Sequence, residues 1–230
     1  MKICIAFQSI AANEKNGDFI LLKKIADGTL VLLADGMGGL DFPEKASKIV
    51  CEAILDYFES YNASDPSKII QESLEYADKT LRKACYQRKC KMGTALTLVY
   101  LTDSFLYYTS LGDVRLYHEH INGTITLLTS DDVINIGGES YLTICINGRG
   151  YRSPIEVYQM SVQTGDRFIL CSDGFYKKYD VSEYFQQRTS PPLQCTEDDC
   201  SVVDINIKKN VRFRQQYIYY RNLIFYILEN

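Results

Sequence analysis

The sequence lacks several features that would assign it to a class at once. None of its apolar runs approaches the ~18 residues that cross a bilayer, so no membrane span is expected. A formal net charge of −4 gives no dominant basic face, which argues against nucleic-acid binding. The opening MKICIAFQSI has one early lysine and an apolar stretch that Gln8 interrupts, unlike a signal peptide. We therefore expect a cytoplasmic protein.

Paired cysteine motifs and a histidine-rich stretch are also missing. None of the eight cysteines forms a C-x-x-C pair, so a zinc site has little support. Cys4, Cys145 and Cys171 lie within apolar runs, which favours reduced, buried thiols over disulfides in a protein without an export signal. With 46% hydrophobic residues, the 230-residue chain can bury one large core, so a single domain is the default interpretation.

The most informative stretch that is present reads VLLADGMGGL, at residues 31–40. Its apolar half predicts a buried strand, and Asp35 then places a carboxylate at the rim of the core, where a charge needs a partner. The glycines after Asp35 allow close approach of the backbone to that partner. The alternative is an ordinary glycine-rich turn. Asp27-Gly28, between two apolar runs, does predict such a turn, whereas a helix follows Asp35.

Sequence patterning predicts an α+β protein. Strands are expected at residues 2–7, 18–25, 29–34, 94–101, 104–111, 114–120, 124–130, 155–160, 167–171 and 201–207. Two amphipathic helices are expected between them, one starting near Pro43 and one capped by Asp65. The four strands between residues 94 and 130 read as an antiparallel meander. The irregular, glycine-rich stretch at residues 130–154 is longer than most connections and predicts a functional flap.

Several aspartates share one context, the end of a predicted strand beside a small residue. They are Asp18, Asp35, Asp113, Asp173 and the pair Asp198 and Asp199. Each alone is typical of a turn or a cap. If the strands form one sandwich, these ends converge, and carboxylates about 4 Å apart repel by roughly 4 kcal/mol at an effective dielectric constant of 20. Such a cluster needs hard cations, and oxygen ligands favour Mg²⁺ or Mn²⁺.

These motifs resemble those of the metal-dependent protein phosphatases, the type 2C serine/threonine family, in its bacterial form. The matching pieces, in the order of that family, are ADGMGG (34–39), MGTALT (92–97), LGDVRLY (111–117), CSDG (171–174) and DDCSVV (198–203). The resemblance covers residues 1–207 and implies a four-layer α-β-β-α sandwich with two antiparallel sheets flanked by helix pairs. Residues 208–230 form a basic and aromatic tail, expected to pack on this domain or to bind a partner or membrane surface.

The resemblance also implies roles for individual residues. Asp35 matches a carboxylate that bridges two metal ions, and the carbonyl of Gly36 matches a ligand of one of them. Asp173 and Asp198 match the ligands of the other ion, with Asp199 as the alternative to Asp198. Asp113 matches a ligand of a third, weaker ion. Asp18 matches an aspartate that contacts metal-bound waters.

The chain departs from the family pattern at several positions. Asn13 stands where the family has a phosphate-binding arginine, and Gly17 replaces an acidic or amide residue; Lys15 is the candidate substitute for binding substrate. Lys177 stands where many relatives have a second ligand of the third ion, so that ion is expected to be weak or absent. Met37 is usual in bacterial members in place of a histidine. The two histidines, His118 and His120, are expected at the surface of one strand.

Three functional interpretations remain open. The first is a Mg²⁺- or Mn²⁺-dependent phosphatase acting on phosphorylated proteins, with a cognate Ser/Thr kinase as a possible partner. The second is a pseudophosphatase that binds phosphoproteins, which the departures at Asn13 and Lys177 motivate. The third is an unrelated metallohydrolase with all-oxygen ligands.

Overall fold

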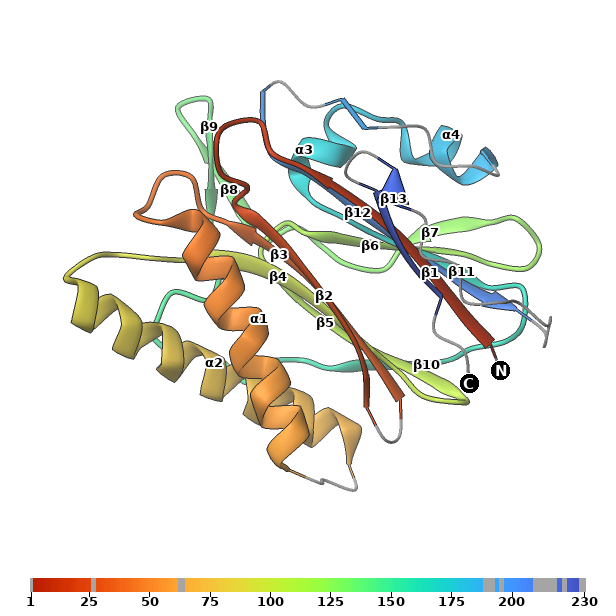
Figure 1. Ribbon diagram of the computed structural model, residues 1–230, viewed down its shortest axis with the longest axis horizontal. Coiled ribbons are helices and arrows are strands. Elements are labelled where there is room, and N and C mark those ends of the chain that lie inside the picture. Colours follow the sequence, from red (N-terminus) through yellow and green to blue (C-terminus); the bar gives the residue numbers. More distant parts are fainter. Residues whose placement is uncertain are drawn as a thin grey trace.

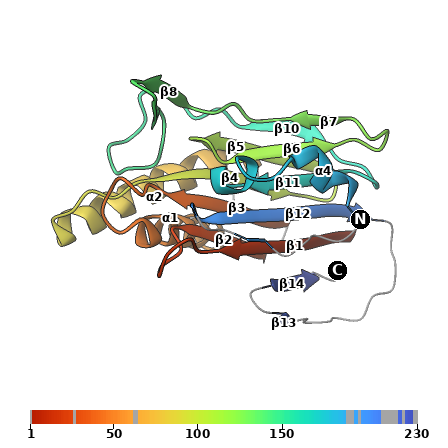
Figure 2. The same ribbon diagram turned by 90° about the horizontal axis from the view of Figure 1, so that it is seen from above.

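Two antiparallel sheets lie face to face, and helices cover the outer face of each (Figures 1 and 2). This arrangement is seen in a computed structural model that describes residues 2–25, 28–61, 65–187, 193–194, 197–208, 219–220 and 223–227, the last two ranges as backbone only. The α+β class and the α-β-β-α order of layers agree with the prediction from sequence.

The sheets differ in size. In spatial order, the larger sheet contains β13 (Tyr219–Tyr220), β14 (Leu223–Ile227), β1 (Lys2–Ile10), β12 (Cys200–Lys208), β11 (Arg167–Cys171), β6 (Arg115–Glu119) and β7 (Ile125–Leu127). The smaller sheet contains β10 (Tyr158–Ser161), β5 (Phe105–Leu111), β4 (Thr94–Leu101), β3 (Gly28–Gly36) and β2 (Asp18–Ile25). A separate hairpin, β8 (Val133–Ile136) and β9 (Glu139–Leu142), belongs to the predicted flap.

The apolar run of strand β3 is unbroken because apolar clusters cover both faces of the strand. Alternate side chains of a strand point to opposite faces. Leu30 and Leu32 therefore belong to the apolar cluster under the helices, whereas Val31 and Leu33 belong to the cluster between the two sheets. Both faces of β3 are buried, so the residues from Leu30 to Ala34 are all apolar before the strand ends at the acidic stretch.

The helix layers are unequal. α1 (Pro43–Ser60) and α2 (Pro66–Arg88) are long and cover the smaller sheet. Asp65 caps α2 as predicted, since its carboxylate accepts the N–H of Ser67 at 2.9 Å. On the larger sheet the described helices are short: α3 (Asp173–Tyr176) and α4 (Val181–Gln186). Their aromatic side chains close a third, smaller apolar cluster on that face.

Two expectations from the sequence are wrong. The four strands between residues 94 and 130 do not form one meander, because β4 and β5 lie in the smaller sheet and β6 and β7 in the larger one. The turn at Gly112 and Asp113 is thus a crossing between sheets. His118 is not at the surface: it is 2% exposed, and its Nε2 lies 3.2 Å from Oδ1 of the buried Asp166. A partner 48 positions away in the chain allows a polar ring inside.

The end of the chain contributes strands to the larger sheet. β14 pairs antiparallel with β1, Cys4 standing opposite Ile227, so the last strands lie beside the first (Figure 2). The remainder of the tail, like Asp27 of the expected β2–β3 turn, lies outside the described residues. Among the described helices, none combines the length and the apolar character needed to cross a bilayer.

Candidate metal centre

Two of the predicted site aspartates face each other on neighbouring strands. The antiparallel register of β2 and β3 pairs Asp18 with Asp35, and directly opposite residues have their side chains on the same face. Gly36 follows, and a Cβ there would lie 2.3 Å from the carbonyl oxygen of Pro43. Glycine at this position therefore lets β3 end tightly against the start of α1, with Asp35 at the rim of the sandwich.

Asp173 and Asp198 reach the same end of the molecule from the larger sheet. Asp173 follows β11 directly and Asp198 shortly precedes β12, and these two strands are antiparallel neighbours. Gly174 permits the close approach, because a Cβ on it would lie 3.2 Å from Cβ of Asp198. Asp113 arrives from the crossing between β5 and β6, which is how the two sheets contribute carboxylates to one place.

The electrostatics show that the fold gathers all five carboxylates. Burial raises the pKa of Asp35 well above its ordinary value, and the charges of Asp18, Asp173, Asp113 and Asp198 raise it further. Burial, chiefly, also raises the pKa of Asp18 to about 7 and that of Asp113 to about 6. Carboxyl groups that hold protons this firmly lack compensating positive charge, and a bound cation would supply it.

A network of hydroxyl groups supports Asp18 on one side only. The Ser172 hydroxyl donates to Oδ2 of Asp18 at 2.8 Å and accepts the N–H of Ser201 at 3.0 Å. Ser201 and Ser9 share a hydrogen bond of 2.7 Å, and Asn16 donates to Ser9 at 2.7 Å. The other oxygen of Asp18, Oδ1, is buried and has no hydrogen-bond partner among the residues that the structure describes. A buried oxygen without a hydrogen-bond partner lowers the stability of the fold unless a ligand supplies that partner.

Asp198 and Asp199 have different surroundings. Asp199 accepts the backbone N–H groups of Ala12 at 2.7 Å and Gly17 at 2.5 Å, so it fixes the loop that precedes Asp18. A Cβ on Gly17 would lie 3.1 Å from Oδ2 of Asp199, which explains why glycine replaces the larger residue of the family pattern. Asp198 instead lies beside Asp173, whose charge raises its pKa in addition to the effect of burial. This arrangement favours Asp198 as the candidate ligand.

Lys15 and Lys177, the two lysines considered for the site, have different partners. The Lys15 ammonium lies 3.1 Å from Glu44 at the start of α1, with 65% of its side chain exposed. Asn13, at the position of the family's arginine, is exposed. Lys177, by contrast, lies 2.6 Å from Oδ2 of Asp173. Lys177 therefore lies at the acidic cluster, where the resemblance placed it, whereas Lys15 is paired at the surface.

The donor set is suited to a hard cation. It consists of carboxylates and the Gly36 carbonyl, without histidine or cysteine, and it includes the unpaired buried oxygen of Asp18. Yet within the described ranges, no three His, Cys, Asp or Glu side chains already stand close enough together to form a metal-binding group. The carboxylates would therefore have to converge further to hold an ion together.

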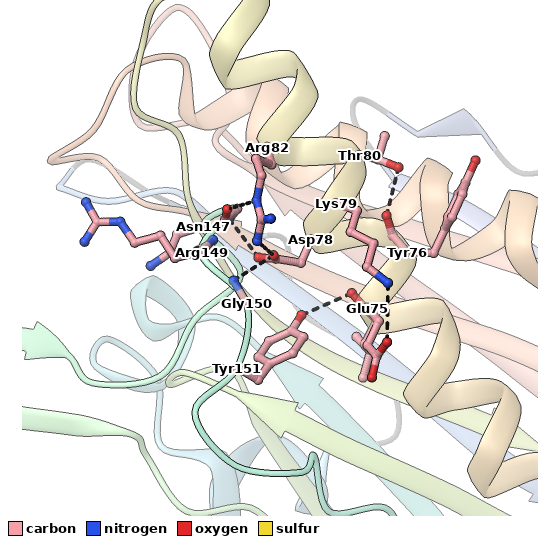
Figure 3. Close-up of polar contacts among 12 residues, drawn as sticks. Glu75, Tyr76, Asp78, Lys79, Thr80, Arg82, Asn147, Arg149, Gly150 and Tyr151 are labelled. Carbon is pink, nitrogen blue, oxygen red and sulfur yellow. Dashed lines mark hydrogen bonds and ion pairs between the residues drawn. The ribbon is translucent and has the colours of Figure 1, made fainter.

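The predicted flap is held at both ends by residues that sequence reasoning missed. At its start, Arg115 forms a two-pronged contact with Asp131, at 3.0 and 2.7 Å. At its end, the buried Asp78 of α2 accepts the N–H groups of Gly148 at 2.7 Å and Gly150 at 2.8 Å (Figure 3). The one sign of Asp78 in the sequence is that a polar residue interrupts the apolar face of α2. Its partners lie 70 and 72 positions away in the chain.

Comparison with known proteins decides the family. The family model described as "Protein phosphatase 2C" matches residues 8–209. The chain belongs to the protein phosphatase 2C family. This confirms the resemblance seen in the motifs, and it argues against an unrelated metallohydrolase. A Streptococcus pyogenes protein whose name assigns it to the protein phosphatase 2C type is 28% identical over 198 residues, covering 76% of this chain and 78% of that protein.

Solved structures of the family share the fold. The Mycobacterium tuberculosis serine/threonine phosphatase PstP/Ppp superposes with a TM-score of 0.75 at 20% identity, covering 91% of this chain and 100% of the other. A PstP catalytic domain in complex with two manganese ions gives a TM-score of 0.70 at 21% identity and covers 90% and 100%. The Staphylococcus aureus phosphatase Stp1 gives 0.73 at 18% identity and covers 89% and 95%. At these identities the likeness establishes the fold.

Proposed function

We propose that the chain is a Mg²⁺- or Mn²⁺-dependent phosphatase that hydrolyses phosphoserine and phosphothreonine in proteins. Membership in the protein phosphatase 2C family supports the reaction class. The observation that carries the proposal is the buried Oδ1 of Asp18, which has no hydrogen-bond partner among the described residues and lies near Asp35, whose pKa is raised by burial and by the charges of four other aspartates. Phosphoproteins, a cognate kinase and a cytoplasmic location belong to the same proposal.

The proposal assigns the ions to specific donors. Asp35 and the Gly36 carbonyl would hold one divalent ion, with Asp35 shared with a second ion that Asp173 and Asp198 would also hold. Asp113 is the candidate ligand for a weaker third ion. When bound, such a pair of ions supplies Lewis-acid chemistry that lowers the pKa of a water molecule and neutralises phosphate oxygens.

The residues of the chain would orient a water molecule and the loop beside it. Asp18 accepts the Ser172 hydroxyl through Oδ2, which leaves Oδ1 to accept from a water. Burial raises the pKa of Asp18 to about 7 without a metal ion, and bound cations would favour the deprotonated carboxylate that accepts from this water. Asp199 positions the loop before Asp18 through the N–H groups of Ala12 and Gly17. Lys15 remains the candidate contact to substrate, as a solvated point charge.

A second candidate function is a pseudophosphatase that binds phosphoproteins without turning them over. It is favoured by the exposed Asn13, which offers no guanidinium to a phosphate, and by Lys15, whose ammonium is shared with Glu44. Both interpretations use the same fold, so activity must separate them.

The deciding experiment is hydrolysis of p-nitrophenyl phosphate and of a phosphothreonine peptide across a titration with Mn²⁺. We expect metal-dependent hydrolysis, and Asp35→Asn should reduce kcat/KM by at least about 100-fold, because it weakens both ions at once. Asp56→Asn, an exposed position on α1, is the matched control and should behave as the wild type. No hydrolysis at millimolar Mn²⁺, or equal rates for wild type and Asp35→Asn, would leave only the binding function.

A further inference from the structure

The position of Lys177 in the acidic cluster is specific. Lys177 ends the turn that begins at Asp173, four residues earlier, and its ammonium lies 2.6 Å from Oδ2 of that carboxylate. Its charge also acts on Asp113 and Asp198. An ammonium group therefore stands among three carboxylates that arrive from separate elements.

The neighbouring lysine provides an internal comparison. Lys178 follows directly in the chain, yet its ammonium contacts the carbonyl of Gln194 and lies 5.9 Å from the ring centre of Tyr179. Arg115, close to Asp113 in sequence, is engaged by Asp131. The contact at Asp173 is thus a property of position 177 and does not reflect a general basic surface around the cluster.

The two sides of the centre differ in how far they are neutralised. On the side of Asp18 and Asp35, a buried carboxylate oxygen has no partner. On the side of Asp113 and Asp173, the ammonium of Lys177 already donates to a carboxylate oxygen. A third divalent ion that binds Asp113 and Oδ2 of Asp173 must overcome repulsion from this ammonium and displace it.

We propose that Lys177 is a built-in cation that takes the place of a third divalent ion on the Asp113–Asp173 side of the centre. The chain would then bind two divalent ions, with the ammonium neutralising the remaining acidic charge. This inference rests on the proposed metal-dependent function and refines it. It predicts a count of ions that can be measured without any assay of activity.

The test uses chelator-treated full-length protein and Mn²⁺ alone as the probe. Equilibrium dialysis gives the number of ions bound per chain, and thermal unfolding gives the midpoint with and without Mn²⁺. The variants are Lys177→Asp, which supplies a further carboxylate, and Lys177→Gln, which removes the charge at an exposed position. Lys178→Gln is the matched control, because it removes the same charge one residue further along.

We expect two ions in the wild type and in Lys178→Gln, and three in Lys177→Asp, whose third ion should bind at least about tenfold more tightly than any further Mn²⁺ binds to the wild type. Without metal, Lys177→Gln should unfold at a lower temperature than Lys178→Gln and gain more from Mn²⁺, since its carboxylates repel until an ion binds. Three ions in the wild type, or two in all variants, would overturn the role of Lys177. Failure of every variant to bind Mn²⁺ would overturn the metal centre itself, and with it this inference.

Discussion

Two buried aspartates, Asp78 and Asp18, have the same side chain and nearly the same burial, at 2% and 5% exposure, but very different surroundings. Asp78 has both oxygens engaged: two backbone N–H groups of the flap donate to it, and the guanidinium of Arg82 lies 3.5 Å away. Asp18 has one oxygen bound by Ser172 and one without a partner.

The comparison separates a fully hydrogen-bonded buried carboxylate from one that is only half hydrogen-bonded. Burying a charge is tolerated when hydrogen bonds and opposite charge complete it, as around Asp78. A buried carboxylate with only one oxygen hydrogen-bonded lowers stability. Such groups are found where a ligand or metal ion supplies the missing partner. Asp78 thus fastens the flap, whereas Asp18 is the aspartate that we propose serves a metal centre, and substitutions should affect the two in opposite ways.

The largest expected effect on stability comes from exchanging each of these aspartates for asparagine in the metal-free protein. Asp78→Asn should lower the free energy of unfolding by about 2–3 kcal/mol, because an amide cannot accept from both glycine N–H groups and leaves a buried donor unpaired. Asp18→Asn should leave it unchanged or raise it by about 1 kcal/mol, because it removes an uncompensated charge. Urea unfolding curves measure both. Equal losses for the two variants would contradict the distinction.

Two glycines sharpen the same comparison with a slightly smaller effect. Gly148 has φ +77° and a Cβ there would lie 2.9 Å from Cα of Arg82, so Gly148→Ala should cost about 2 kcal/mol and disturb the Asp78 anchor. Gly38, beside Asp35, has open space where its Cβ would be, so Gly38→Ala should change stability by less than about 0.5 kcal/mol. Thermal unfolding of both variants checks this, and a large loss in Gly38→Ala would show that the glycine turn is tighter than described.

The pH dependence of the metal-free protein should follow Asp18. Its pKa in the folded protein is raised to about 7 by burial, so between about pH 4 and pH 7 the folded state holds a proton that the unfolded state has released. Stability is therefore greatest at the acidic end of this window for this group and falls as the pH rises through it.

The control for that measurement is Asp18→Asn, whose unfolding free energy should vary less between pH 4 and pH 7. Mn²⁺ should reverse the slope, because an ion favours the deprotonated carboxylates. Superimposable curves for wild type and Asp18→Asn would contradict the pKa assigned to Asp18.

The smallest expected effect concerns Lys15. Its ammonium pairs with Glu44 at the surface, and exposed ion pairs contribute little. Lys15→Gln should change the free energy of unfolding by less than about 0.5 kcal/mol, and KM for a phosphopeptide should rise no more than about threefold. Steady-state kinetics would show a much larger rise if Lys15 were the main phosphate contact.

Local patterns predicted most of the elements. The spacing of apolar residues predicted that Ile70, Leu74 and Ala77 of α2 are buried, and the capping residue Asp65 predicted where the helix begins. The recurring aspartates at strand ends gave the acidic site, because a strand end at the rim of a sandwich is where a carboxylate can meet others. These signals lie within a few residues of each other in the sequence.

Long-range features could not be predicted in the same way. A turn such as Gly112-Asp113 reads alike whether its strands pair or cross between sheets, so the meander was assumed. The burial of His118 depends on Asp166, and the role of Asp199 depends on N–H groups of Ala12 and Gly17 far away in the chain. No spacing in the sequence reports such contacts.

The most direct test of the central claim is anomalous diffraction at the manganese absorption edge from crystals of the wild-type chain grown with Mn²⁺. We predict two strong peaks, both near Asp35, one of them also beside the Gly36 carbonyl and the other beside Asp173 and Asp198. An absence of peaks at this end of the sandwich, or peaks only at other positions, would contradict the assignment of these residues as a metal centre.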